Sequence, residues 1–272
     1  MLSTVFLIVG LAILGFACRS FQKTLIRKMG LLAFMGASFV LFQELSGSWV
    51  VGCLGIALWF CLPWIELLTR VRQMDLPIEK PLRRRIPPED TYPFLAASAS
   101  EIENVGAFEH IDDWGYEWNG AEHFFRLFYD TETRTQAIVC LTADEFMTHA
   151  YVKLVSRASN DQAYTTWNYP FAASLKQSPE NRLHWDRTSA SFYGILDSHL
   201  EFLDRMHISS EEIKDQDTNN FMEMLRADQR RLVDHNLSQG VLKPSGEGVC
   251  RYTWRGLIFL WTQLVKDMVR LH

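Results

Sequence analysis

Three long apolar runs occupy the first quarter of the chain, at residues 2–18, 30–42 and 49–68. A helix needs about 20 apolar residues to cross a bilayer, with roughly 17 as a lower limit, so the first and third runs are long enough. The middle run reaches that length only if its helix also takes in the flanking residues 27–29 and 43–46. Two spans with a re-entrant or interfacial segment are the alternative to three.

The distribution of basic residues decides between these two counts. Four Lys or Arg residues follow the first run and six follow the third, whereas the link between the second and third runs carries only Glu44. Cytoplasmic loops of membrane proteins are enriched in Lys and Arg. The sequence therefore predicts a multi-pass membrane protein with helices at about 2–18, 28–46 and 49–68. Its N-terminus is expected outside, and everything after Thr69 in the cytoplasm.

The first run also has features of a signal sequence, because the residues before Cys18 loosely resemble a lipoprotein cleavage site. No basic residues precede the run, which favours an uncleaved anchor. The five cysteines contain no C-x-x-C pair, so we expect reduced thiols and no zinc or redox site.

A linker is predicted at 70–91, because Pro77, Pro81, Pro87 and Pro88 disfavour helix and favour extended backbone. Its basic residues form a predicted collar at the membrane surface. The collar consists of Arg70, Arg72, Arg83, Arg84 and Arg85. These residues can bind anionic lipid headgroups, or their charge can serve only to set the topology.

The pattern changes to strands and helices in the predicted domain at 92–208. A helix is expected at 92–105, followed by an antiparallel meander in which residues 123–141 and 149–168 form two hairpins. From Phe192 to Met206 the apolar positions return to a helical period, and such a helix would cover one face of the sheet. The order of elements predicts an α+β fold.

The C-terminal segment, 209–272, is expected to form a helix at 221–237, a β-hairpin at 240–256 and a final helix at 257–271. Its hairpin resembles the wing of winged-helix regulators, with Tyr252, Thr253 and Gly256 fitting the return strand loosely. The resemblance implies DNA contacts through Arg230, Arg231, Lys243 and Arg251. Nine basic residues are balanced by nine acidic residues after position 208. Affinity for DNA needs a basic surface, so DNA binding is disfavoured.

Candidate chemistry is sparse along the chain. No nucleophile elbow, zinc-protease helix, P-loop or dinucleotide-binding glycine pattern is present. His110, Asp112 and Asp113 have metal-binding side chains but lie beside a predicted turn, so a solvated turn is favoured and no metal or cofactor is expected. His199 lies in an apolar stripe, where a hydrogen-bonded core histidine is the common outcome. Glu145 and His149 flank a loop, so helical metal-ligand geometry is not expected.

Aromatic residues are concentrated in the predicted strands, and a sheet face that carries them can bind a partner or a ligand. The predicted surface comprises Trp114, Tyr116, Trp118, Phe124, Phe128, Tyr151, Tyr164 and Trp167. The alternative is a sheet covered on both faces.

Charge separates the two parts of the chain, since the net charge of −5 over 272 residues divides into a basic first third and an acidic remainder. The missing motifs favour a non-enzymatic, membrane-anchored scaffold that contacts lipids and a protein partner. The alternative is a membrane-associated enzyme or a domain that binds lipid or a small ligand. A deep pocket lined by Glu122, His123, Arg126 or His149 would favour that alternative. A membrane-tethered DNA-binding regulator is the least favoured function.

Overall fold

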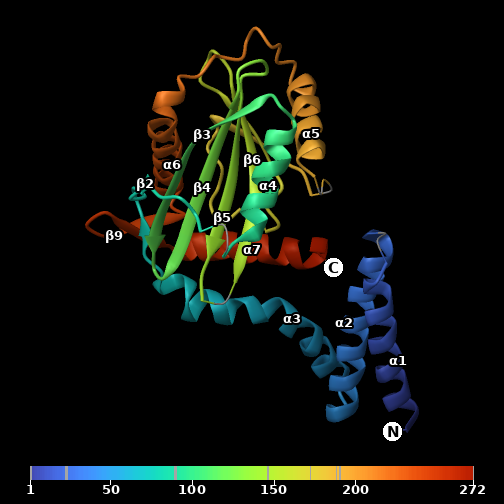
Figure 1. Cartoon of the computed structure of the whole chain (residues 1–272). Helices are drawn as coiled ribbons and strands as arrows, with labels where there is room; N and C mark the ends of the chain where they lie inside the picture. The colour runs from blue at the N-terminus through green and yellow to red at the C-terminus, as the bar shows by residue number, and fades with distance from the viewer. Residues whose placement is uncertain are drawn as a thin grey trace.

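The computed structural model describes residues 2–21, 24–88, 91–145, 147–171, 173–187, 189 and 191–271. The chain forms a mixed helix-and-sheet fold with a seven-stranded sheet, which confirms that part of the predicted fold class. Three N-terminal helices lead into the sheet domain, and the last helix lies between that domain and the third N-terminal helix (Figure 1).

The N-terminal helices pack against one another where phenylalanine rings of one helix contact glycines of the next. The three helices are α1 (Leu2–Arg19), α2 (Thr24–Ser46) and α3 (Trp49–Thr69). A Cβ atom at Gly15 on α1 would lie 2.9 Å from the ring of Phe34, and one at Gly55 on α3 would lie 2.5 Å from the ring of Phe42. Small residues at such contacts let helices approach closely.

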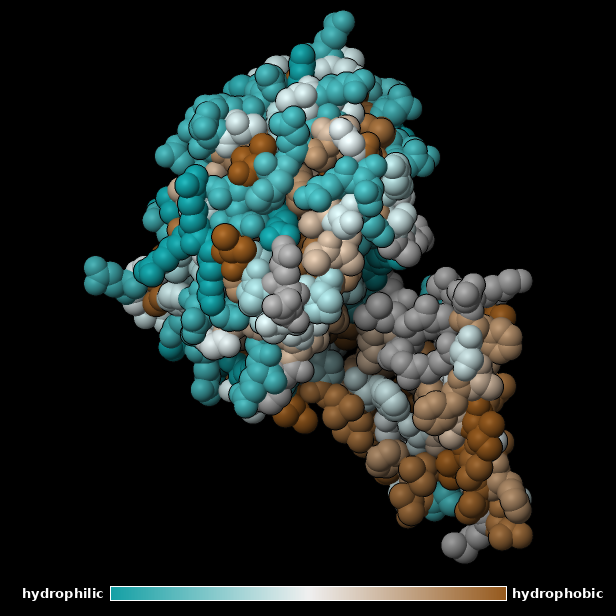
Figure 2. All heavy atoms as spheres, viewed as in Figure 1, coloured by the Kyte–Doolittle hydropathy of each residue, from teal (hydrophilic) through white to brown (hydrophobic). Residues whose placement is uncertain are grey.

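Two helical stretches are long and apolar enough to cross a membrane, among the residues described. They are Lys28–Ser46 and Trp49–Gln73, while the apolar stretch Leu2–Cys18 is shorter. The middle stretch has the bounds predicted for it, because α2 begins at Thr24 and includes the residues that flank the apolar run. The first run, predicted to be long enough, is the shorter one. Apolar residues dominate the surface of these helices, whereas the visible face of the sheet domain is mostly polar (Figure 2).

The proline-rich linker is extended but joined to both sheets. After a 3-10 turn at Val71–Gln73, strand β1 (Leu76–Pro77) pairs with the C-terminal hairpin and strand β2 (Arg83–Arg84) pairs with the large sheet. Asp75 lies just before β1 and accepts two hydrogen bonds from the Arg251 guanidinium, at 2.6 and 3.0 Å. The linker therefore holds the domain against the end of α3.

The seven-stranded sheet has the order β2-β3-β4-β5-β6-β7-β8. Its other strands are β3 (Phe108–Trp118), β4 (Ala121–Asp130), β5 (Thr135–Ala143), β6 (Thr148–Arg157), β7 (Ala163–Trp167) and β8 (Asn181–Trp185). All neighbours are antiparallel except β7 and β8, which are parallel. Parallel strands need a crossover connection, and here it is the segment 168–180.

Alternate residues along the strands face different layers of the fold. On one face, Phe124 and Phe128 are fully buried against α4 (Pro93–Asn104) and α5 (Phe192–Arg205). On the other face, Phe125 and Leu127 belong to a cluster that includes Leu225 of α6. Both faces of the sheet are therefore covered by helices over part of their area.

The C-terminal segment has the expected order of helix, hairpin and helix. After the 3-10 turn Thr218–Asn220, the elements are α6 (Phe221–Ser238), β9 (Leu242–Gly246), β10 (Val249–Tyr252) and α7 (Trp254–Leu271). With β1, the hairpin forms a separate three-stranded sheet. Its core joins Val241 and Leu257 to Leu67 at the end of α3, so this segment packs on α3.

Candidate functional site

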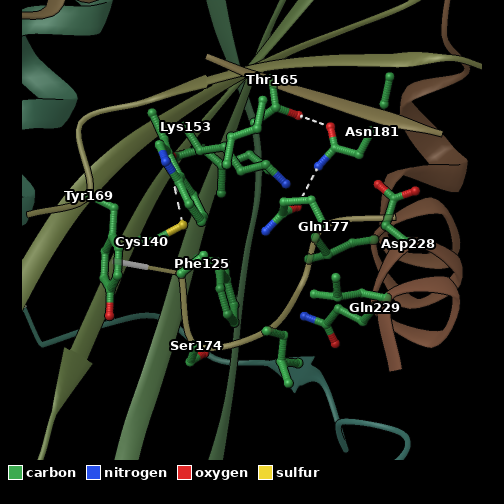
Figure 3. A pocket seen from close by; sticks show the side chains of 18 of the residues that line it. Phe125, Cys140, Lys153, Thr165, Tyr169, Ser174, Gln177, Asn181, Asp228 and Gln229 are labelled. Atoms are coloured by element: carbon green, nitrogen blue, oxygen red, sulfur yellow. Dashed lines mark hydrogen bonds between the residues drawn. The ribbon is translucent and has the colours of Figure 1, made fainter. Parts of the chain in front are cut away.

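A cavity of about 350 Å³ lies between the seven-stranded sheet and α6. Figure 3 shows Phe125, Cys140 and Lys153 on the sheet side and Asp228 and Gln229 on the helix side. Pockets that hold small ligands begin at roughly this size. The cavity is therefore large enough for a small organic molecule.

Cross-strand rows of side chains form the floor of the cavity. One row pairs Phe125 with Cys140 and Cys140 with Tyr151. Directly opposite residues in a sheet place their side chains on the same face, next to one another. A second row runs from Ile138 through Lys153 to Trp167, and a third joins Tyr116, His123, Thr142 and His149.

The crossover between β7 and β8 forms one wall. It contributes Tyr169, Ser174 and Gln177, and it stays close to the sheet through a chain of hydrogen bonds. Thr165 donates to the side-chain oxygen of Asn181 at 2.8 Å, and the Asn181 amide donates to Gln177 at 3.1 Å (Figure 3). Because β7 and β8 are parallel, the chain between them must cross one face of the sheet, where it lines the cavity. A short antiparallel hairpin would leave that face uncovered.

The linker forms another wall of the cavity, to which it contributes the cationic side chain of Lys80. Its Nζ lies 5.3 Å from the centroid of the Tyr116 ring, and burial lowers the pKa of Lys80 to about 8. Burial also lowers the pKa of Lys153. Removal of an ammonium group from water disfavours its charged form, which explains both shifts.

The histidines and the thiol on the floor are neutral at pH 7. Burial, followed by the Lys80 charge, lowers the pKa of His123 to about 4, and burial lowers the pKa of His149. Burial raises the pKa of the Cys140 thiol to about 11. A thiol is a weak nucleophile compared with a thiolate, so this cysteine is poorly suited to covalent catalysis.

Several buried polar atoms at the cavity have no hydrogen-bond partner within the described part of the chain. They are Nδ1 of His149, Nε1 of Trp167, Oε1 of Gln229 and Nε of Arg157. Buried polar atoms are nearly always hydrogen-bonded in proteins, because leaving one without a partner costs about 1–3 kcal/mol. Together, these atoms can bind the polar groups of a ligand.

The predicted aromatic surface is divided among three environments. Tyr116, Tyr151 and Trp167 line the cavity, and Trp114 and Trp118 lie on the same sheet face in the cluster around Tyr116. The other three residues, Phe124, Phe128 and Tyr164, pack in the clusters that contain α5 residues. Of the four polar residues expected for a ligand pocket, His123 and His149 line the cavity, whereas Glu122 binds Arg85 and Arg126 binds Asp113.

Members of the basic collar contact the protein itself. Arg84 lies 2.9 Å from Asp112, Arg85 pairs with Glu122, and Arg72 lies over the Trp254 ring at 4.7 Å. Arg70 pairs with Glu66 one turn earlier, and Arg83 is exposed. Part of the collar charge is thus balanced by carboxylates of the same chain.

The other candidate polar residues have structural partners. Asp113 is buried and accepts from Arg126 at 2.9 Å, with His110 at 3.3 Å. His199 is fully buried, and its ring nitrogens lie 3.0 Å from Ser156 Oγ and 2.9 Å from Thr166 Oγ1. The His199 contacts connect α5 to β6 and β7, whereas the Asp113 contacts lie within β3 and β4.

Sequence reasoning missed the residues that give the cavity its charge and shape. They are Lys80, Cys140, Lys153, Tyr169, Asp228 and Gln229. Of these residues, Lys153 is the one whose place in the sequence could have indicated a site. It is a charged residue in an otherwise apolar strand and lies on the same strand face as Tyr151. No protein-family model matches the chain, and no curated protein or solved structure matches it either.

Proposed function

We propose that this protein is a membrane-anchored module that binds a small molecule in the cavity between the sheet and α6. The observation that carries the proposal is the group of buried polar atoms without partners, His149 Nδ1, Trp167 Nε1 and Gln229 Oε1, around one aromatic cavity. Sites for small ligands are mostly apolar and contain a few converging polar groups. The cavity thus supports ligand binding over the scaffold function expected from the sequence.

The neutral thiol and histidines support binding without covalent chemistry. The Nδ1 atom of His123 lies 3.0 Å from Thr142 Oγ1, but the strands hold these groups in a row along the floor of the cavity. A hydroxyl nucleophile needs a base that is itself oriented by a third group. Tyr116 stacks on the face of the His123 ring, with ring centroids 4.3 Å apart, so packing against an aromatic ring helps to hold this imidazole in place.

Membrane anchoring is supported by the two long apolar helices and by α7. Helix α7 packs against α3 and exposes Trp254 (56%) and Ile258 (52%). An amphipathic helix beside a spanning helix is suited to the bilayer interface, where tryptophan is enriched. The proposed topology has three spans, the N-terminus outside and the sheet domain in the cytoplasm.

The ligand proposal is tested by native mass spectrometry of the full-length protein, purified gently from its own membrane. We expect the unmodified protein to carry a bound small molecule that the Leu232→Trp variant lacks. Leu232 lines the cavity, so the larger indole in its place would occupy the space for the ligand. Leu200→Trp is the matched control, since Leu200 is 41% exposed on α5. Equal ligand retention in Leu232→Trp and the control would contradict the proposal, as would recovery of the same protein partner with both variants and no small molecule.

Topology is tested with single cysteines in sealed vesicles that contain the full chain. Ser48 is partly exposed and Ser210 is exposed, and they lie on either side of the proposed spans. A maleimide that cannot cross membranes should label Ser48→Cys and Ser210→Cys from opposite sides. Labelling of both from the same side would overturn the proposed arrangement.

A further inference from the structure

We infer that the cavity ligand is a small planar organic anion, with its negative group bound by Lys80 and Lys153 and its apolar body held between aromatic side chains. This inference rests on the proposed function, because it names the class of ligand for the same cavity. It is carried by the balance of charge in the cavity, by the aromatic floor and by the polar atoms without partners.

The two carboxylates on the cavity lining, Asp228 and Glu180, both interact with arginines. Asp228 binds the Arg157 guanidinium and lies 3.7 Å from Arg231. Glu180, at the far end of the crossover, has its pKa lowered by a hydrogen bond from Ser178 and, to a smaller extent, by the Arg231 charge. The two acidic groups on the lining are thus balanced by the two arginines on the same lining.

Neither lysine has an ion-pair partner among the residues that the structure describes, although the Asp228 charge acts on Lys153 from beyond ion-pairing distance. Both lysines line the same cavity, and the Lys80 charge is one of the causes that lower the pKa of Lys153. Two cations in one partly enclosed cavity favour an anionic occupant, since buried charges are nearly always paired.

Aromatic rings define the shape of the space beside these charges. The Tyr151 and Tyr169 rings meet edge to face with centroids 4.8 Å apart, and Trp167 lies 5.4 Å from Tyr169. With Phe125 and Tyr116, they give the cavity flat apolar surfaces. Aromatic side chains bind planar groups by stacked and edge-on contacts.

The polar atoms without partners require complementary groups on the ligand. The Trp167 indole can only donate a hydrogen bond, so the ligand must present an acceptor to it. A carboxylate or phosphate oxygen supplies that acceptor and also balances the lysines. The volume of about 350 Å³ is at the lower end for ligand sites, which favours a body of one or two fused rings.

Three probes with the same aromatic body separate charge from shape: naphthoate, naphthyl phosphate and the uncharged naphthamide. Each is titrated by calorimetry into the full-length protein in nanodiscs of neutral lipid, with empty nanodiscs as the blank. We expect naphthoate or naphthyl phosphate to bind at least about tenfold more tightly than naphthamide. The preferred anion of the two distinguishes a carboxylate ligand from a phosphate ligand.

Lysine variants connect this preference to the site. Lys80→Met and Lys153→Met should each weaken anion binding about tenfold and leave naphthamide binding unchanged. Lys243→Met is the matched control, because Lys243 is exposed on the separate hairpin. Thermal unfolding of each variant without ligand checks that it is folded.

Each alternative result has a defined meaning. Equal affinity for naphthamide and the anions, or unchanged anion binding in both lysine variants, overturns the anionic class and leaves the proposed cavity function intact. Failure of all three probes to bind overturns the planar class. The proposed function itself fails only if native mass spectrometry finds no cavity-dependent ligand, so the two failures are distinguishable.

Discussion

The Trp261 indole donates a hydrogen bond to the backbone carbonyl oxygen of Phe60 at 2.7 Å. This contact joins the last helix of the chain to the third. The same indole stacks on Trp64 one turn further along α3, with ring centroids 6.0 Å apart. Helix α7 is therefore held by α3 on one side and by the core of the C-terminal hairpin on the other.

Replacement of Trp261 by phenylalanine should loosen this junction. The variant loses the hydrogen bond and part of the stacking on Trp64, which together are worth about 1–2 kcal/mol. Thermal unfolding in nanodiscs should show a lower midpoint, and hydrogen exchange should increase along α7. Trp49→Phe is the control, since Trp49 is 68% exposed. Equal midpoints for the two variants would show that the junction contributes little.

Gly256 permits a close approach that no other residue allows. A Cβ atom there would lie 2.2 Å from the Val241 carbonyl oxygen and 3.0 Å from the Tyr252 ring. That carbonyl accepts a hydrogen bond from the Thr253 amide, so it cannot move without breaking the turn. We expect Gly256→Ala to destabilise the protein by about 1–3 kcal/mol, as overpacking does in other cores.

The control for Gly256→Ala is Gly36→Ala in α2. The added Cβ would meet only Leu11 Cδ1 at 3.7 Å, an ordinary contact. Alanine is favoured over glycine inside a helix by roughly 0.5–1 kcal/mol, so this variant should be neutral or more stable. Similar unfolding midpoints for both variants would mean that the turn at Gly256 adapts.

Local patterns predicted the elements that have a clear period. The helices near 92–105, 192–206 and 221–237, the two hairpins of the large sheet and the C-terminal hairpin all have counterparts in the structure. In each of these segments, neighbouring residues alone indicate the element, either by the spacing of the apolar positions or by turn-forming residues. Long helices and tight hairpins are therefore the parts of this fold that a single sequence reveals.

Non-local pairing accounts for what the sequence did not reveal. Strands β1 and β2 contain two residues each, too few for any period, and each depends on a partner far along the chain. Strand β8 pairs in parallel with β7 only after the crossover folds back. The cavity is formed by that crossover, by Lys80 from the linker and by α6, so its residues come together only in the folded chain.

Binding of an anion at Lys80 should weaken as the pH rises. Burial lowers the pKa of Lys80 to about 8, so this ammonium loses its proton in the unliganded protein above that pH. An anion binds the protonated form, and the observed affinity should fall by up to about tenfold per pH unit above pH 8 for each lysine that titrates. Titrations with naphthoate from pH 7 to 9 measure this slope.

The groups around Lys80 determine how this slope is interpreted. They are Tyr116, His123, Cys140 and Lys153 at the cavity, and Glu79, Arg226 and Arg230 at the adjacent surface. His123, with a pKa of about 4, and Cys140, with a pKa of about 11, do not titrate between pH 7 and 9. Lys80→Met should reduce the slope, and Lys243→Met should leave it unchanged. A flat profile in the unmodified protein would contradict a role for Lys80 in anion binding.

His199 should make the protein sensitive to acid. Burial lowers the pKa of His199 to about 3, with a smaller effect from His184, while an unfolded histidine titrates near pH 6.5. Between these values the unfolded chain binds a proton that the folded chain does not. Stability is therefore highest above pH 6.5 and falls as the pH is lowered toward 3, by up to about 1.4 kcal/mol per pH unit for this group.

His199→Gln removes the titrating group and should flatten this part of the stability profile. At pH 7 the variant should be less stable by about 1–3 kcal/mol, because Ser156 and Thr166 lose well-placed partners. His207→Asn is the control, since His207 is exposed and its left-handed backbone (φ 57°) is one that asparagine tolerates. Thermal unfolding from pH 7 to 4 should separate the two variants. An equal loss of stability with acid in His199→Gln and in the unmodified protein would assign that loss to other groups, with the partly buried His123 next in order.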